Sequence, residues 1–215
     1  MQCLSMTQVK CDYYKQFFID YRNIKEEGKP KLLLHVCCGA CSCYPLIFLT
    51  ELFDITILFS NSNIFPKEEY DKRLNALKEY VRKIEKDLNT KINIIEDDYN
   101  HTNFIKDLIP YKDEKEGGKR CEICIKKRMR RLFEYATKNN FKYVTTVMSI
   151  SRNKNSLFIN ELGSYLEDEY KNIKYIHADF KRDGGQELGI KLSTKYNVYR
   201  QNYCGCEFSL LNRKK

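Results

Sequence analysis

Cysteines gather in three short stretches of the chain, and thiols are the groups here most able to do chemistry. The three groups are Cys37/Cys38/Cys41, Cys121/Cys124 and Cys204/Cys206. Thiolates bind soft metals and act as nucleophiles, whereas packing a core does not require adjacent cysteines. The CxxC at 121–124 opens a predicted helix, where residues three apart face the same way and the helix dipole favours thiolate. A CxxC by itself fits zinc, an iron–sulfur cluster or a redox disulfide.

The number of grouped thiols exceeds what one metal centre needs. A closed zinc site or a [4Fe–4S] cluster takes four protein ligands, so seven cysteines leave three for a second metal with an open position. The alternative is one structural zinc with unrelated buried cysteines, because free cysteine is often buried. We treat the remaining three cysteines as bystanders: Cys3, Cys11 and Cys43.

Short apolar runs alternate with amphipathic segments along most of the chain. Strands are predicted at 31–36, 54–59, 92–95, 142–148 and 173–178. Helices are predicted at 8–24, around 45–52, at 68–88, 101–109, 121–139 and 156–170, and near 194. This order predicts an α/β fold, with a Rossmann-like, mainly parallel sheet of about five strands flanked by helices. We expect a single domain over residues 1–215, with an N-terminal helix and a C-terminal Cys-Gly-Cys segment that closes the site.

Parallel sheets bind ligands at the carboxyl ends of their strands. Four polar loops leave predicted strand ends, and they start at Cys37, Ser60, Ser149 and Asp179. The loop at Cys37 cannot hold two metals by itself, so the CxxC helix and the segment 204–206 must close around it. The sequence therefore predicts a metal site at this edge of the sheet.

Charge is distributed unevenly along the 215 residues. The formal net charge is +9, of which residues 1–110 contribute −1 and residues 111–215 contribute +10. A basic half fits a polyanion such as nucleic acid, and equally a lysine-rich surface. The sequence shows no secretory signal and no apolar run near the roughly 20 residues of a membrane span, which predicts a cytoplasmic protein without membrane contact.

Five stretches of the chain resemble, in order, the QueH-type epoxyqueuosine reductases. They are residues 33–42, 61–73, 118–130, 178–181 and 199–206, the last reading Tyr-Arg-Gln-Asn-Tyr-Cys-Gly-Cys. The resemblance spans about residues 31–209. It differs from the family pattern at Gly39-Ala40, where Ala-Pro is usual, and at 149–154, a loose version of a Ser-Pro-rich loop.

The resemblance implies the last step of queuosine synthesis. Epoxyqueuosine, already on the wobble base of tRNA, is reduced to queuosine with loss of water. The resemblance also implies a [4Fe–4S] cluster beside a second, mononuclear iron, without cobalamin, and an external one-electron donor that is ferredoxin- or flavodoxin-like. The seven grouped cysteines are the expected ligands, and zinc could occupy the second site in purified protein.

Further side chains are expected to act on the substrate. A nearby acid must protonate the departing oxygen, and we expect Asp179 in that region, as proton donor or iron ligand, ahead of Tyr203 and His35. The competing interpretation of Asp179 is a helix cap or a surface carboxylate. An anticodon-loop base can be splayed out and stacked on Tyr199 or Phe65. The expected substrate and tRNA contacts are Asn63, Lys126, Arg130, Arg152, Tyr199 and Arg200.

Two other functions compete with this one. A tRNA sulfur transferase of the ATP-pyrophosphatase type needs a Ser-Gly-Gly-type phosphate loop after the first strand, where this chain has the cysteine loop at 37–42. A zinc-stabilised RNA-binding module would hold zinc alone and be colourless, whereas a [4Fe–4S] protein is brown.

Overall fold

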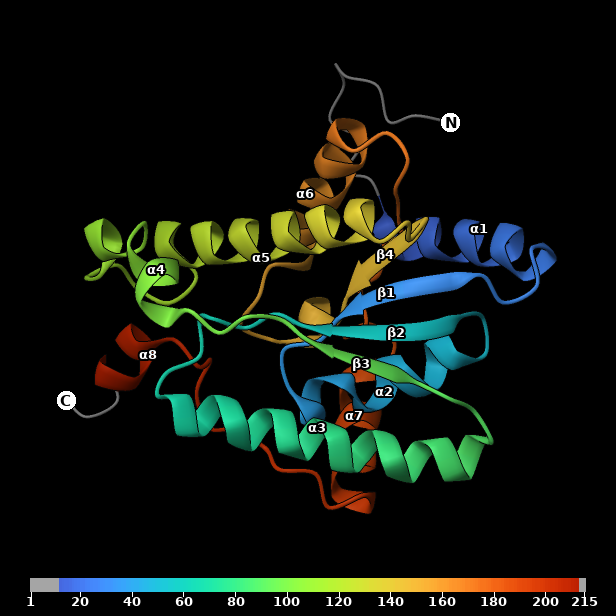
Figure 1. The fold of residues 1–215 in the computed structure, drawn as a ribbon, viewed down its shortest axis with the longest axis horizontal. Coiled ribbons are helices and arrows are strands. Elements are labelled where there is room, and N and C mark those ends of the chain that lie inside the picture. The colour runs from blue at the N-terminus through green and yellow to red at the C-terminus, as the bar shows by residue number, and fades with distance from the viewer. Residues whose placement is uncertain (1–11, 213–215) are drawn as a thin grey trace.

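A five-stranded sheet, with every neighbouring pair of strands parallel, forms the centre of the computed structural model, which describes residues 12–212. The strands are β1 (Lys31–His35), β2 (Asp54–Phe59), β3 (Asn93–Glu96), β4 (Tyr143–Thr146) and β5 (Lys174–Tyr175). Their order is β3-β2-β1-β4-β5 (Figure 1). The leucines of β1 are buried because helices cover both faces, which is why its sequence is a continuous apolar run. The predicted α/β class is confirmed.

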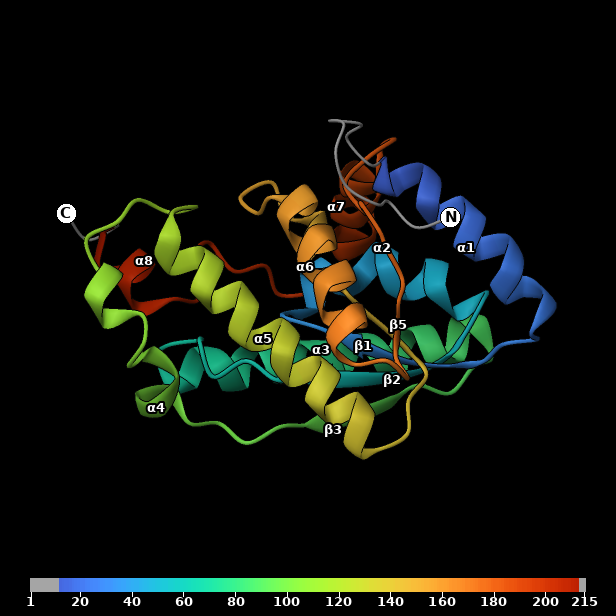
Figure 2. The same ribbon diagram turned by 90° about the horizontal axis from the view of Figure 1, so that it is seen from above.

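Helices cover the two faces of the sheet, as Figures 1 and 2 show. One face carries α5 (Lys119–Lys138) and α6 (Ser156–Glu169). The other carries α2 (Gly39–Thr50), α3 (Lys67–Leu88) and α7 (Gly185–Lys195). The N-terminal helix α1 (Tyr13–Glu26) packs on α2, with the Phe17 and Phe48 ring centroids 5.3 Å apart.

Short elements gather beyond the carboxyl ends of the strands. The helices α4 (His101–Ile105) and α8 (Glu207–Asn212) lie there, near the C-terminus in Figure 1. Two 3₁₀ turns are formed by Ile109–Tyr111 and Val147–Ile150. The sequence did not predict α8. No helix within residues 12–212 has the length and apolar character needed to cross a membrane.

Several elements differ from their predicted bounds, and three of the differences have a local reason. The helix α2 begins at Gly39, six residues early, because the sulfur of Cys38 caps it. The strand β4 ends at Thr146, where its backbone turns into the 3₁₀ segment. The strand β5 has two residues, since the side-chain amide of Asn160 bonds both backbone groups of Ala178 at 3.1 Å in place of a strand partner. The predicted helix start at 8–11, together with Cys3 and Cys11, lies outside the described residues.

The strand order places a crevice between β1 and β4. From β1 the chain moves outward to β2 and then β3, and it later returns to the other side of β1 with β4 and β5. The loops after β1 and β4 therefore diverge at the carboxyl ends of the strands, and ligands bind at such a switch point. The cysteine groups meet there.

Candidate metal centre

The first cysteine group lies where β1 turns into α2. Cys37 and Cys38 follow the strand, and Cys41 is in the first turn of the helix. The three sulfur atoms lie within 4.8 Å of one another, a spacing that would let them share a metal ion. The Cys38 sulfur accepts a hydrogen bond from the backbone N–H of Cys41 at 3.2 Å, so it takes the place of a serine N-cap. A group of thiols that could hold a metal therefore lies at the end of the first strand, where the sequence predicts one.

Two adjoining cavities lie among the three cysteine groups. The first cavity, of about 280 Å³, is lined by Cys37, Cys41 and Cys204. The second cavity, of about 120 Å³, is lined by Cys121, Cys124, Cys204 and Cys206. Cys204 belongs to both walls, together with four further residues: Glu116, Arg128, Asn153 and Lys154. Three groups that are far apart in the sequence therefore meet at one place in the fold.

The remaining cysteines of residues 12–212 are placed differently. Cys38 lies beside the first cavity, where its sulfur accepts a hydrogen bond from the Gln201 amide at 2.9 Å. Cys43 is buried inside α2, donates to the carbonyl of Gly39 at 3.3 Å, and lines neither cavity. All eight cysteines described are free thiols.

The ionisation of the thiols differs between the groups. Hydrogen bonds from Cys38 and Cys41 hold the pKa of Cys37 well below its usual range. Burial raises the pKa of Cys38, and the Cys37 sulfur raises that of Cys41 to about 12. One thiolate in this group therefore keeps its neighbours protonated, and binding of a metal would have to displace their protons.

The CxxC thiols do not follow the expectation from the helix dipole. Cys121 and Cys124 do open α5 and line the same cavity, as their spacing predicts. However, burial raises the pKa of Cys121 above its usual value and that of Cys124 to about 12. Desolvation of the thiolate outweighs the helix dipole at these positions.

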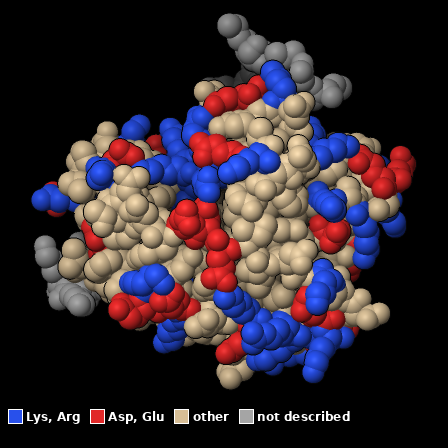
Figure 3. All heavy atoms as spheres, viewed as in Figure 1, with Lys and Arg blue, Asp and Glu red and all other residues tan. Residues whose placement is uncertain are grey.

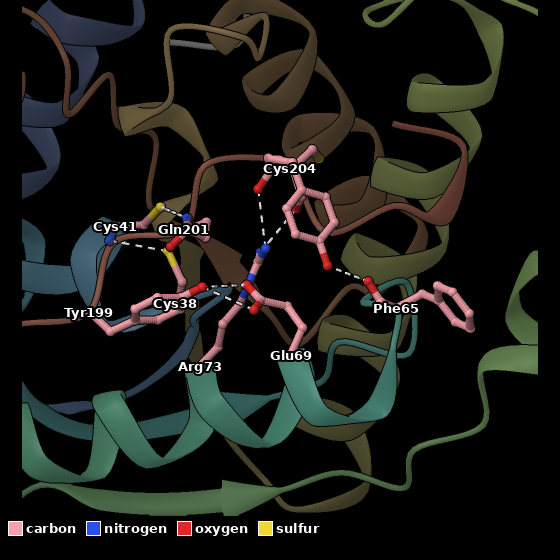
Figure 4. A network of polar contacts seen from close by, with 9 residues as sticks. Cys38, Cys41, Phe65, Glu69, Arg73, Tyr199, Gln201 and Cys204 are labelled. Atoms are coloured by element: carbon pink, nitrogen blue, oxygen red, sulfur yellow. Dashed lines mark hydrogen bonds and ion pairs between the residues drawn. The ribbon is translucent and has the colours of Figure 1, made fainter. Parts of the chain in front are cut away.

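The C-terminal segment is held over the site by Arg73 of α3. This buried guanidinium pairs with Glu69 at 2.7 Å and donates to the carbonyl oxygens of Tyr203 and Cys204, each at 3.1 Å (Figure 4). The backbone N–H of Phe65 also donates to the Gly205 carbonyl at 2.8 Å. Gly205 has φ = +107°, and a Cβ there would lie 2.9 Å from Nη1 of Arg73, so a glycine between the two cysteines is required.

Known proteins resemble this chain along most of its length. The family model for epoxyqueuosine reductase QueH matches residues 32–212. This chain belongs to the QueH family. The epoxyqueuosine reductase QueH of Staphylococcus aureus is 38% identical over 192 residues, which cover 88% of this chain and 79% of that protein. Its counterpart in Streptococcus pyogenes serotype M1 is 35% identical over 185 residues, which cover 86% of this chain and 72% of that protein. The epoxyqueuosine reductase QueH of Thermotoga maritima is 34% identical over 187 residues, which cover 86% of this chain and 92% of that protein.

The family match confirms the resemblance predicted from the sequence. Proteins of this name are oxidoreductases, which agrees with the predicted class of enzyme. The match includes the cysteine loop after β1, where a sulfur transferase would need its phosphate loop. It favours neither the sulfur transferase nor the zinc-stabilised RNA-binding module.

Several predicted site residues of this QueH chain lie at the first cavity. They are the expected contacts Asn63, Arg152 and Arg200 and the expected proton donor Tyr203. Asn63 is buried, whereas the two arginines are exposed. Arg152 donates to the side chain of Gln186 at 2.6 Å, and Arg200 donates to Ser193 at 3.1 Å. The structure thus brings these side chains to the same cavity as Cys37, Cys41 and Cys204.

Other predicted residues lie outside the walls of both cavities. Asp179 accepts a hydrogen bond from Ser156 at the start of α6 and lines a small aromatic cavity beside α1. Tyr199 donates to Glu69 at 3.0 Å. Lys126 and Arg130 are exposed on α5, Lys126 near the ring of Phe158 and Arg130 paired with Glu169.

Two further side chains considered from the sequence have clear positions. Phe65 is 39% exposed, and its ring centroid lies 5.1 Å from that of His101. His35 is fully buried, with Nδ1 2.8 Å from the Thr146 hydroxyl, and burial lowers its pKa to about 3. His35 is therefore a neutral, hydrogen-bonded histidine of the core.

Sequence reasoning missed the side chains that join the cysteine groups. Gln201, Arg73, Arg128, Lys154 and Glu116 all line the first cavity. Gln201 precedes Cys204 by three residues, and this short spacing was the available signal. The other four are charged residues of types that are usually exposed, so nothing local distinguishes them from surface residues.

Proposed function

We propose that this chain reduces epoxyqueuosine in tRNA to queuosine, the last step of queuosine synthesis, without cobalamin. We further propose that its seven grouped cysteines hold a [4Fe–4S] cluster and an adjacent iron. The observation that carries the proposal is the meeting of all three cysteine groups around two adjoining cavities in a chain of the QueH family.

The residues present fit two metals. Seven thiols exceed the four that a cluster takes, and three of the sulfurs already lie within 4.8 Å of one another. The guanidinium of Arg128, buried at both cavities, lacks a carboxylate partner within residues 12–212, which suits an anionic centre. When bound, the metals would supply electrons and Lewis acidity toward the epoxide oxygen.

The chain's own residues would bind and orient the modified base. Asn63 and Gln201 each have a buried side-chain oxygen without a hydrogen-bond partner among the described residues, and both line the first cavity. Amide oxygens accept hydrogen bonds from the N–H groups of a base edge, and exposed aromatic rings such as Phe65 can stack on a splayed base. These groups can hold the nucleoside with its epoxide toward the cysteines.

The exposed arginines of the first cavity would contact the tRNA phosphates. Arg152 and Arg200 suit this role, and the exposed Lys126 and Arg130 would provide further phosphate contacts along α5. On the face drawn in Figure 3, Lys and Arg side chains are interspersed with Asp and Glu side chains. Among its described residues this face offers no continuous basic surface, so the proposal depends on the basic residues at the cavity. Such a tRNA substrate, and thiols that stay reduced, favour a cytoplasmic location.

The proton for the departing oxygen is proposed to come from Tyr203 or Asp179. Burial raises the pKa of Tyr203 to about 12, so the phenol keeps its proton at neutral pH. Its hydroxyl donates to the Phe65 carbonyl and lies on a residue that lines the first cavity. Asp179 would have to act from outside the described cavity lining.

A Tyr203→Phe substitution is expected to slow single-turnover reduction by about 10²-fold or more if the phenol is the proton donor. The lost hydrogen bond should cost only about 1 kcal/mol of stability. A matched control is Tyr99→Phe, which removes a similar bond to the neighbouring Ile64 carbonyl (2.8 Å) at a residue that lines neither cavity. Equal rates for the two variants would exclude Tyr203 as the donor.

The direct test of the function uses protein purified without oxygen and loaded with iron and sulfide. It is incubated with tRNA carrying epoxyqueuosine and a one-electron reductant of flavodoxin or ferredoxin type, with cobalamin absent. Mass spectrometry of the digested nucleosides should show queuosine, lighter by one oxygen atom. Iron, sulfide and zinc analysis accompanies the assay. Loaded protein that makes no queuosine, or protein that takes up zinc alone, would contradict the proposal.

A further inference from the structure

Three arginines are almost fully buried, and they differ in what compensates their charge. Arg73, 2% exposed, is paired with Glu69. Arg120, 1% exposed, donates to three loop carbonyls, at distances of 2.6 to 3.5 Å. Arg128, 3% exposed, makes one hydrogen bond, to the side-chain oxygen of Asn61 at 2.7 Å; its Nε, like that of Arg120, is buried without a partner among the described residues.

The charge of Arg128 is therefore uncompensated among the described residues. No carboxylate of residues 12–212 lies within ion-pair distance of it. Its one neutral partner, Asn61, is itself fixed by donating to the Val36 carbonyl at 2.8 Å. An isolated buried charge is strongly unfavourable, so such a position implies an anion that the protein binds.

Lys154 lies at the same two cavities as Arg128. Both side chains line the first and the second cavity, and Lys154 likewise has no carboxylate partner within residues 12–212. Lys154 is half-buried, and the two cavities that it shares with Arg128 are lined by cysteines of all three groups. The Glu116 carboxylate also lines both cavities, but it forms no ion pair with either cation among the described residues. The cysteine groups are therefore the common neighbours of the two cations.

We propose that Arg128 and Lys154 are the counter-charges of the thiolate-bound metal centre, raising its reduction potential and its metal affinity. This inference rests on the proposed function. A cluster held by thiolates is an anion, and each electron it accepts from an external one-electron donor adds a negative charge. Fixed positive charges in a low-dielectric site stabilise the reduced form more than the oxidised form. The two side chains themselves exchange no electron and form no bond.

A role of Arg128 in binding tRNA phosphate is not compatible with its burial. A side chain that is 3% exposed cannot reach a phosphate, whereas Arg152 and Arg200 at the same cavity are exposed and can. The exposed arginines are therefore the candidates for phosphate contact, and the buried, unpaired Arg128 is the candidate for a charge that acts on the metal centre.

A potentiometric titration followed by EPR, on protein loaded with iron and sulfide and without tRNA, tests the inference. For Arg128→Met, the ratio of reduced to oxidised cluster at the wild-type midpoint should fall roughly tenfold or more, equivalent to about 59 mV for one electron. Arg128→Lys keeps the charge and should stay within about twofold of wild type. Lys154→Met should shift in the same direction as Arg128→Met.

The matched control is Arg131→Met on the same helix. It removes the same charge three residues further along α5, from a side chain that is 43% exposed and paired with Asp97. Its potential and iron content should equal those of wild type, because solvent screens an exposed charge.

Each outcome decides the question. Wild-type potentials for Arg128→Met and Lys154→Met, or an equal shift for Arg131→Met, would overturn the inference and leave the proposed function intact. If Arg128→Met binds no iron, its potential cannot be measured. The potentials of Lys154→Met, expected to fall, and of Arg128→Lys, expected to stay near wild type, then test the inference. A wild-type protein that takes up no redox-active cluster would overturn the inference together with the proposed function.

Discussion

Cys204→Ser is expected to abolish turnover and to lower the iron bound per chain, because Cys204 is the cysteine that lines both cavities. A serine hydroxyl does not ionise near neutral pH and is a poor ligand for iron in a sulfur-rich centre. The loss should affect both proposed metals at once. Iron and sulfide analysis, the visible absorption of the anaerobic protein and the nucleoside assay measure it. Cys38→Ser should likewise lower both the turnover and the iron bound per chain.

Cys43→Ser is the matched control for this prediction. The same change of atom is made at a cysteine that is buried in α2 and lines neither cavity. A hydroxyl there can still donate to the Gly39 carbonyl, so metal content should remain that of wild type. Full iron and full activity in Cys204→Ser would refute the assignment of the metal centre to this place.

Arg73→Leu is expected to destabilise the metal-free protein by about 3–5 kcal/mol, because it leaves the largely buried Glu69 carboxylate without its ion-pair partner and with only the Tyr199 hydroxyl as a donor. It also removes the two hydrogen bonds that hold the carbonyls of Tyr203 and Cys204. Since these bonds position the C-terminal cysteines, iron binding should fall as well. Urea unfolding measures the stability, and iron analysis at a temperature where the variant is folded measures the second effect.

Two further variants separate the position of Arg73 from its charge. Arg73→Lys keeps the charge but lacks the planar fork that reaches Glu69 and two carbonyls, so it should recover only part of the stability. Lys78→Met, on the same helix, breaks a surface pair with Glu96 and should cost about 0–1 kcal/mol. If Arg73→Leu unfolds at the same urea concentration as Lys78→Met, the proposed role of Arg73 in closing the site is wrong.

The fold was predictable where the signal is local. The apolar run of β1 and the helical spacing of Tyr70, Leu74, Leu77, Val81 and Ile84 in α3 depend on neighbours in sequence, and these residues are buried as expected. The ends of elements were less predictable, because distant side chains decide them. Asn160 of α6 replaces a strand partner beyond β5, which shortens a strand whose sequence is apolar for longer.

The candidate site shows the same division. The sequence by itself determined that three groups of thiols exist, at spacings suited to metals, because cysteine chemistry depends on residue type and short spacing. Only the tertiary structure decided that Cys204 belongs to both cavities, and that Gln201, Arg73 and Arg128 connect the groups. The physical reason is that their partners are 163, 130 and 67 residues away in the chain, and that burial turns ordinary surface residue types into fixed charges and donors at the site.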